Sequence, residues 1–174
     1  RPVDVVGNNA GYGQRRSFLR NDVTVEEAAF DVLTRAVLVL SHAAGVTMRE
    51  RGRGRIINVS SVAGFIASGS YSAAKAWVTT FSEGLAAELA GSGVTVTALC
   101  PGFTNTEFQE RAGIDKPGPD FMWLDPTRLV SECLDDVDRG RVLSVPGLQY
   151  KAIVGLLRVM PRSIVRRRAR LVRR

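Results

Sequence analysis

Short apolar runs alternate with long amphipathic segments along most of the chain. The apolar runs have the length of buried strands and lie at residues 3–6, 56–59, 94–99 and 142–145. Between them, apolar residues recur every three or four positions, as in helices, at residues 24–50 and 71–90. Strands that alternate with long helices favour a parallel sheet with helices on both faces. The pattern therefore predicts a doubly wound α/β sheet.

Local signals predict where several of these elements begin and end. Thr24 followed by Glu27 has the spacing of a capping box, which would open the first long helix. Asp125 followed by Pro126 predicts the start of a later helix. Residues 103–124 are irregular and rich in aromatic residues and proline, which indicates a loop or lid. Because no linker divides residues 1–146, we predict one domain there, followed by a helical tail at 147–174.

The net charge of +7 resides in the tail. Residues 151–174 contain nine basic residues and no acidic one, whereas the other 150 residues carry 15 basic and 17 acidic residues. Val165, Ala169 and Val172 continue an apolar stripe at helical spacing. Two interpretations stay open: a solvated terminal helix, or a peripheral anchor with its arginines toward anionic lipid. Nucleic acid is a weaker partner, because no aromatic residues interleave the arginines.

The cysteine and histidine content bears on compartment and chemistry. Cys100 and Cys133 are isolated, without disulfide or metal-ligand spacing, which favours a reducing, cytoplasmic setting. The single histidine, His42, lies in an apolar helical stretch and is interpreted as structural. We therefore predict neither a metal site nor a histidine-based catalytic triad.

The stretch YSAAKAW at residues 71–77 holds a tyrosine and a lysine four positions apart. On a helix these positions share one face, so the phenol of Tyr71 and the ammonium of Lys75 could meet. An ammonium beside a phenol favours the phenolate and lowers a pKa that is ordinarily about 10. Such a group could act as an acid or base near neutral pH. The alternative is a half-buried aromatic with a lysine extending past it.

Position along the sheet favours the catalytic interpretation. Ligands of doubly wound sheets bind beyond the carboxyl ends of the strands. The segments expected there are NNAG (8–11), SSVAG (60–64) and PGFTNT (101–106), and the helix with Tyr71 starts near the same edge. As alternatives, NNAG and PG are also good turn sequences, and Ser60 and Ser61 could simply cap a strand end.

Four motifs in this order resemble those of the short-chain dehydrogenase/reductase superfamily. They are NNAG (8–11), INVSS (57–61), YSAAK (71–75) and PGFTNT (101–106), and the resemblance extends from about residue 2 to residue 106. Members of that superfamily move a hydride between NAD(P) and a carbonyl or alcohol. The resemblance implies a Rossmann-like fold and a small-molecule substrate, apolar or lipid-like. It also implies a possible homo-oligomer.

The resemblance implies a role for each matching residue. Tyr71 would be the general acid or base, Lys75 would lower its pKa and bind the nicotinamide ribose, and Ser61 would hold the substrate oxygen. The implied cofactor is NADP or NAD, with NADP favoured by the reductase-like relatives. The residues implied to bind it are Asn9, Ala10, Gly11, Tyr71, Lys75, Pro101, Gly102, Thr104 and Thr106.

The sequence departs from the family pattern in three places. It has no glycine-rich cofactor loop, and its first strand resembles the family's fourth, so the strands and helix that would hold the pyrophosphate are missing. We therefore expect an N-terminally truncated member that is inactive alone. Leu33 stands where many relatives have a catalytic asparagine, and Ser61 precedes Tyr71 by ten residues, fewer than is usual. The competing hypothesis is a non-catalytic remnant or interaction module that keeps the fold.

Overall fold

The computed structural model describes residues 2–14, 16–108 and 118–171, with side chains described as far as Arg166. Its centre is a parallel sheet of four strands in the order β1-β2-β3-β4. The strands are β1 (Val5–Asn8), β2 (Gly54–Val59), β3 (Val94–Leu99) and β4 (Leu143–Ser144). In register, Val6 faces Ile56 across β1 and β2, and Ile56 faces Val96 across β2 and β3. The predicted parallel α/β sheet is confirmed.

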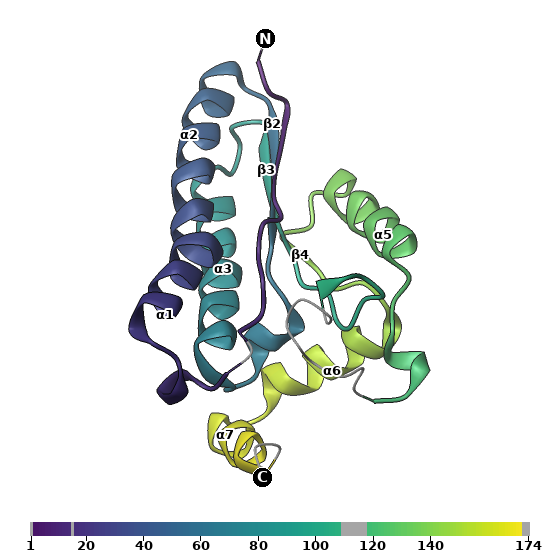
Figure 1. Cartoon of the computed structure of the whole chain (residues 1–174). Coiled ribbons are helices and arrows are strands. Elements are labelled where there is room, and N and C mark those ends of the chain that lie inside the picture. The colour runs from purple at the N-terminus through teal and green to yellow at the C-terminus, as the bar shows by residue number, and fades with distance from the viewer. Residues whose placement is uncertain (1, 15, 109–117, 172–174) are drawn as a thin grey trace.

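Helices cover the two faces of the sheet unequally (Figure 1). On one face lie α3 (Gly69–Glu88) and a long helix made of α1 (Val23–Phe30), a π-helical turn (Asp31–Arg35) and α2 (Ala36–Arg51). On the other face, α5 (Pro126–Asp138) packs against β3 and β4. Short 3-10 turns lie at Phe18–Arg20, Val62–Phe65 and Asp120–Met122.

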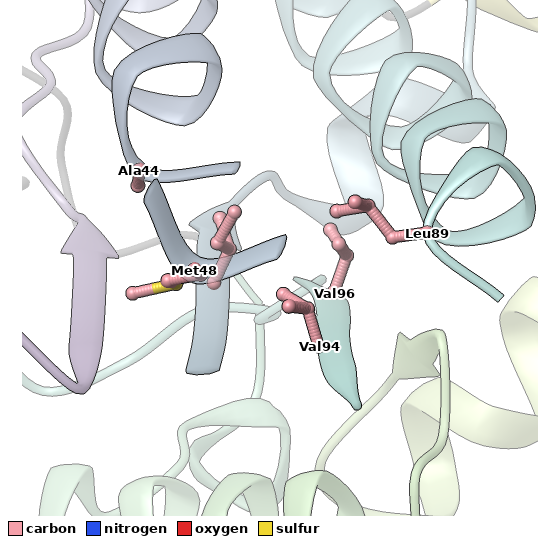
Figure 2. Packing of buried hydrophobic residues seen from close by; sticks show 6 residues of the cluster. Ala44, Met48, Leu89, Val94 and Val96 are labelled. Carbon is pink, nitrogen blue, oxygen red and sulfur yellow. The ribbon is translucent and has the colours of Figure 1, made fainter. Parts of the chain in front are cut away.

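Apolar side chains fill the layer between the sheet and the helices α2 and α3. Figure 2 shows Met48 of α2, Leu89 after α3 and Val96 of β3 in this cluster, which also includes Ala44, Ile56 and Val94. On the opposite face, Leu99 packs with Leu129, Cys133 and Val137 of α5. Both cysteines are free and buried. Successive side chains of β3 point to opposite faces of the sheet, so this strand contributes to both apolar layers.

A buried polar layer lies toward the carboxyl ends of β1 and β2. The Asn8 amide donates to the Oδ1 of Asn58 at 2.7 Å and to the Ser41 hydroxyl of α2 at 3.1 Å. The Asn58 amide donates in turn to the Ser82 hydroxyl of α3 at 3.0 Å. These bonds cross-link two strands and two helices, and breaking one leaves a buried polar group unsatisfied. The layer therefore fixes how α2 and α3 sit on the sheet.

The structure corrects one predicted helix start and confirms another. Asp22, not Thr24, caps the first long helix, because the Asp22 carboxylate accepts the Thr24 N–H at 2.9 Å. The helix thus begins at Val23, and the predicted capping box is wrong. Asp125 caps α5 as predicted, accepting the Arg128 N–H at 2.9 Å. The first strand lies at Val5–Asn8, two residues later than predicted.

The continuous helix Val23–Arg51 is long and apolar enough, by length and composition, to cross a membrane. The same properties occur in core helices of globular domains. Its residues Val37, Ala44 and Met48 are buried, and α2 contacts β1 and β2. This packing accounts for the apolar character of its inner face.

Two helices form the C-terminal segment. They are α6 (Leu148–Val159) and α7 (Arg162–Leu171), separated at Pro161, which no helix interior accommodates well. Tyr150 and Val154 of α6 are buried with Ala98, Cys100 and Val145. The first half of the predicted tail is therefore anchored in the core. Beyond Val154, Leu156 and Val159 are 59% and 80% exposed, whereas Val165, from the predicted apolar stripe, is buried; the side chains of Ala169 and Val172 lie outside the described residues.

The outer edge of β1 and the residues just before it are exposed to solvent. Val3 and Val5 are 60% and 51% exposed, and α5 contacts β3 and β4. Within the part of the chain that the structure describes, β1 pairs with a strand on one side only. An open strand edge beside exposed valines is a surface on which further strands or a second chain can pair.

Candidate active site

The four sequence motifs meet at the carboxyl edge of the sheet, as predicted from strand direction. NNAG begins at the last residue of β1, Ser60 and Ser61 follow β2, and Pro101 lies just beyond β3. Two backbone bonds tie these loops together, from Ser60 N to Leu99 O at 2.7 Å and from Val62 N to Pro101 O at 3.0 Å. In Figure 1 this edge lies between α6 and the start of α3.

Lys75 lies at the centre of this edge and is 5% exposed. Its Nζ donates to the Val59 carbonyl at 2.8 Å and lies 5.7 Å from the centroid of the Tyr71 ring. A Cβ added to Gly11 would lie 3.6 Å from the same Nζ. The structure thus brings the NNAG segment, the end of β2 and the tyrosine–lysine pair together around one buried ammonium.

The two pKa values are shifted by burial. Burial raises the pKa of Tyr71 to about 12, and a hydrogen bond with the Ser61 hydroxyl opposes part of that rise. Burial also lowers the pKa of Lys75 to about 8. The predicted lowering of the Tyr71 pKa by Lys75 is therefore wrong for the chain as it stands. Burial removes hydration that would stabilise the phenolate, and this raises the pKa of Tyr71 above its ordinary value.

The two serines after β2 have different surroundings. Ser60 is buried, and its hydroxyl donates to the Lys75 carbonyl at 2.6 Å and lies 2.7 Å from the Thr79 hydroxyl. It joins the strand end to α3. Ser61 is half-buried, and its Oγ accepts the Ala63 N–H at 3.1 Å and lies 3.4 Å from the Pro101 carbonyl. Ser61 thus caps the next 3-10 turn, and its hydroxyl also reaches Tyr71.

Leu33 lies within the π-helical turn and packs near the tyrosine–lysine pair. It is 2% exposed and joins a small apolar cluster that includes Tyr71 and Tyr12. A Cβ on Gly11 would lie 3.2 Å from its Cδ2. The leucine side chain therefore closes this wall with hydrocarbon where an asparagine would supply a polar group.

Tyr150 of α6 is a site-supporting residue that the sequence did not reveal. Its hydroxyl accepts the Phe103 N–H at 2.9 Å and donates to the Met122 carbonyl at 2.7 Å. Its ring lies directly against Gly102, where a Cβ would overlap the ring atoms. Gly102 is thus explained by close packing. The contact joins residues 48 positions apart, so no local pattern could have indicated it.

Two of the residues assigned to the cofactor, Gly11 and Thr106, line a cavity of about 420 Å³. Gly11, Tyr12, Thr106, Glu107 and Phe108 line it. The Thr106 hydroxyl accepts the Phe108 N–H at 3.3 Å, and the Thr104 hydroxyl donates to the Gly102 carbonyl at 3.1 Å. Asn9 and Ala10 are exposed beside Gly11. The last residues of the NNAG and PGFTNT segments thus meet at one opening, while Asn9, Ala10, Pro101, Gly102 and Thr104 are not in its lining.

A larger cavity, of about 730 Å³, has Tyr71 in its lining. It runs between α1 and the first half of α3, and its apolar lining includes Phe18, Phe30 and Trp77. Phe108 of the smaller cavity packs on the Tyr71 ring, with ring centroids 6.1 Å apart. Tyr71 therefore lines the larger cavity and contacts one wall of the smaller cavity through Phe108.

Known proteins share both the sequence and the architecture of this chain. The sequence profile of the short chain dehydrogenases matches residues 1–117. A 3-oxoacyl-[acyl-carrier-protein] reductase of Synechocystis sp. is 40% identical over 111 residues, which are 62% of this chain and 45% of that protein. The chain thus spans about half the length of the curated relatives that it matches.

Two solved structures extend the similarity to the fold. A short-chain dehydrogenase of Sphingobium yanoikuyae in complex with NADPH has a TM-score of 0.78 and 32% identity, and the match covers 91% of this chain and 66% of that one. A short chain dehydrogenase of Burkholderia cenocepacia in complex with NADP has a TM-score of 0.79 and 26% identity over 95% of this chain and 68% of that one. With the matching profile, these similarities show that the chain belongs to the short-chain dehydrogenase family.

Proposed function

We propose that the protein is an oxidoreductase that transfers a hydride between NADP(H), or NAD(H), and a carbonyl or alcohol substrate of apolar, lipid-like character. Tyr71 is its general acid or base, Lys75 its partner, and Ser61 the group that holds the substrate oxygen. The relatives support the oxidoreductase class and the cofactor, because one is named a reductase and two solved neighbours hold NADPH and NADP.

The buried ammonium of Lys75 is the observation that carries the proposal. Burial disfavours the charged form of this side chain and lowers its pKa to about 8. Within the described residues, the only hydrogen bond of its Nζ is to the Val59 carbonyl. An ammonium has three N–H donors. The two others can serve a bound ligand, and they lie beside the ring of Tyr71 and the backbone of Gly11.

The cofactor fits the described residues on its nicotinamide side. Lys75 would hold the ribose, Thr104 and Thr106 would border the carboxamide, and the stretch from Asn9 to Gly11 would line the adenosine side. The cavity that Gly11 and Thr106 line offers room for the nicotinamide half of the cofactor. When bound, the nicotinamide supplies or accepts the hydride.

The protein's own part in the reaction is to hold and move a proton. With a pKa of about 12, the Tyr71 phenol is protonated at neutral pH and can donate to a carbonyl oxygen. As a C–H bond forms at the carbonyl carbon, the phenol proton passes to the oxygen and leaves an alcohol and a phenolate. In the oxidising direction the phenolate takes the proton back. The apolar walls formed by Leu33 and Phe108 exclude water from the phenol.

The test is hydride transfer by the full-length protein and its Tyr71→Phe variant on a panel of ketones and aldehydes. We expect the variant to lose about 10²–10⁴-fold in rate, the usual contribution of a positioned acid–base group. Its melting temperature should stay within a few degrees, since the ring remains. Activity of Tyr71→Phe within about tenfold of wild type would refute the role.

Residues 1–174 alone are expected to be inactive and to bind NADPH too weakly to measure by fluorescence titration. These residues include no glycine-rich loop to hold the pyrophosphate. If instead the full-length protein also fails to bind NAD(P)H, the alternative of a non-catalytic remnant that keeps the fold is favoured.

We further propose that the C-terminal segment contacts anionic membranes. Leu156, Val159 and Ile164 are exposed next to Arg162 and Arg166, which gives an apolar surface beside a basic one. Such a pairing is typical of helices that lie in the membrane interface. Arg158 differs from these arginines, because it forms a salt bridge with Glu83 of α3 at 3.1 Å and so links α6 to the rest of the domain.

A further inference from the structure

A carboxylate in the first turn of α1 gathers three hydrogen bonds near the active site. The Oε2 of Glu26 accepts from the Gln14 amide and from the Ser70 hydroxyl, each at 2.6 Å, and its Oε1 accepts from the Asn21 amide at 2.6 Å. The Ser70 hydroxyl also lies 2.9 Å from the Gln14 Oε1. One side chain thus joins the loop that follows NNAG, the start of α1 and the start of α3.

The start of α3 lacks the local features that usually hold a first turn in place. Its N-cap residue, Ser68, makes no side-chain hydrogen bond to the helix, and the first turn contains no acidic residue. The helix begins at Gly69, whose φ of 75° lies in the left-handed region. Tyr71 follows two residues later. The turn that carries the phenol is therefore held by contacts from elsewhere in the chain.

We propose that Glu26 is the positioning residue for Tyr71, acting through its hydrogen bond to Ser70. Ser70 and Tyr71 are adjacent, so fixing the Ser70 side chain fixes the backbone from which the phenol projects. The same carboxylate holds Gln14, two residues beyond Tyr12 of the smaller cavity. Glu26 thereby sets the spacing between the two sides of the site.

The charge state of Glu26 suits this role at neutral pH. Burial acts to raise the pKa of its carboxyl, and the hydrogen bonds from Ser70, Asn21 and Gln14 together outweigh burial and lower it. The carboxylate is therefore ionised throughout the range in which the protein would work. Hydrogen bonds to a charged acceptor are roughly twice as strong as neutral ones.

The experiment compares local opening of α3 in four variants of the chain by hydrogen exchange with mass spectrometry. Glu26→Ala removes the acceptor, Glu26→Gln keeps its size but not its charge, and Ser70→Ala removes the donor. The matched control is Glu27→Ala, which deletes the neighbouring, exposed carboxylate. We expect exchange of the amides at 69–74 to rise at least tenfold in Glu26→Ala and less in Glu26→Gln. Residues 78–88 and the control should not change.

Two further readouts separate positioning from general stability. Tyrosine ring NMR should show the pKa of Tyr71 falling from about 12 toward 10 in Glu26→Ala, because an opened turn admits water to the phenol. The Glu26→Ala/Ser70→Ala double variant should open α3 by less than the sum of the two single variants, since both remove the bond between Glu26 and Ser70.

The proposal is overturned if exchange at 69–74 and the Tyr71 titration match wild type in Glu26→Ala, or if the two substitutions act additively. These readouts do not depend on catalysis. Only the kinetic consequence rests on the proposed function: about a tenfold loss of kcat with an unchanged KM for NADPH in the full-length protein. Absence of activity in wild type would refute the proposed function and leave the exchange result standing.

Discussion

Replacing Gly102 with alanine places a methyl group where the Tyr150 ring now lies. The added Cβ would overlap the ring at Cζ, Cε1 and Cε2, so the ring must leave its position or the backbone of residues 101–103 must shift. Tyr150 is 2% exposed, and its hydroxyl bridges Phe103 N and the Met122 carbonyl. The substitution is therefore expected to disturb both packing and hydrogen bonding.

The expected loss of stability follows from these two terms. A buried aromatic side chain covers about 150–250 Å², so exposing half of it costs about 2–3 kcal/mol at 25 cal/mol per Å². Losing the two hydrogen bonds of the hydroxyl adds about 1–3 kcal/mol. We expect Gly102→Ala to lower the free energy of unfolding by about 3–6 kcal/mol, a large share of the roughly 5–15 kcal/mol typical of a domain.

Urea denaturation followed by circular dichroism measures this loss from the transition midpoint. Gly155→Ala in α6 is the matched control, since nothing lies within 4 Å of a Cβ at that position. Because alanine suits a helix better than glycine, the control should gain about 0.5–1 kcal/mol. A Gly102→Ala loss below about 1 kcal/mol would refute the close-packing explanation of the PG motif.

Two other predictions concern Lys75 and the C-terminal segment. Since burial lowers the Lys75 pKa from 10.5 to about 8, the unfolded chain binds more protons between those values, and stability from this group rises with pH. From pH 8 to 10 the unfolding free energy of wild type should therefore rise by about 2–3 kcal/mol relative to that of Lys75→Met. A pH-independent difference between the two proteins would show that the ammonium is hydrated in the folded state. For the C-terminal segment, co-sedimentation with anionic vesicles should be lost on deleting residues 160–174 and weakened by salt, which screens charges over about 10 Å at 0.1 M. Equal sedimentation of intact and shortened proteins would exclude the membrane contact.

The fold was largely predictable because its information is local. The strand at 94–99 and the cap at Asp125 follow from apolar runs and short-range hydrogen bonding, and both match the structure. The first helix start was misassigned because Asp22 and Thr24 are both good caps, and only the chain's geometry shows which one accepts the N–H. The break at the π-helical turn around Leu33 has no signal in the hydrophobic pattern.

The sequence predicted where the candidate site lies, but it did not predict the pKa values of Tyr71 and Lys75. Strand direction places the motifs at one edge, so the neighbourhood of Tyr71 and Lys75 follows from topology. Their pKa values depend on how much water the fold removes from each group, which no pair spacing encodes. The supporting contacts from Tyr150 to Gly102 and from Glu26 to Ser70 each span more than 40 residues, and the sequence contains no pattern that links them.

Packing and internal hydrogen bonds explain why some motif residues are present, but they do not explain Lys75. Ser60 and Gly102 are accounted for by packing and internal hydrogen bonds alone, and they would be needed in this fold without any chemistry. Lys75 is different, because a buried ammonium costs stability, and the one carbonyl that it bonds to among the described residues offsets only part of that cost. A methionine would fill the same space without the penalty. A residue that the fold alone would disfavour is best explained by a ligand that uses its charge, and the open cavity beside Gly11 is where that ligand would lie.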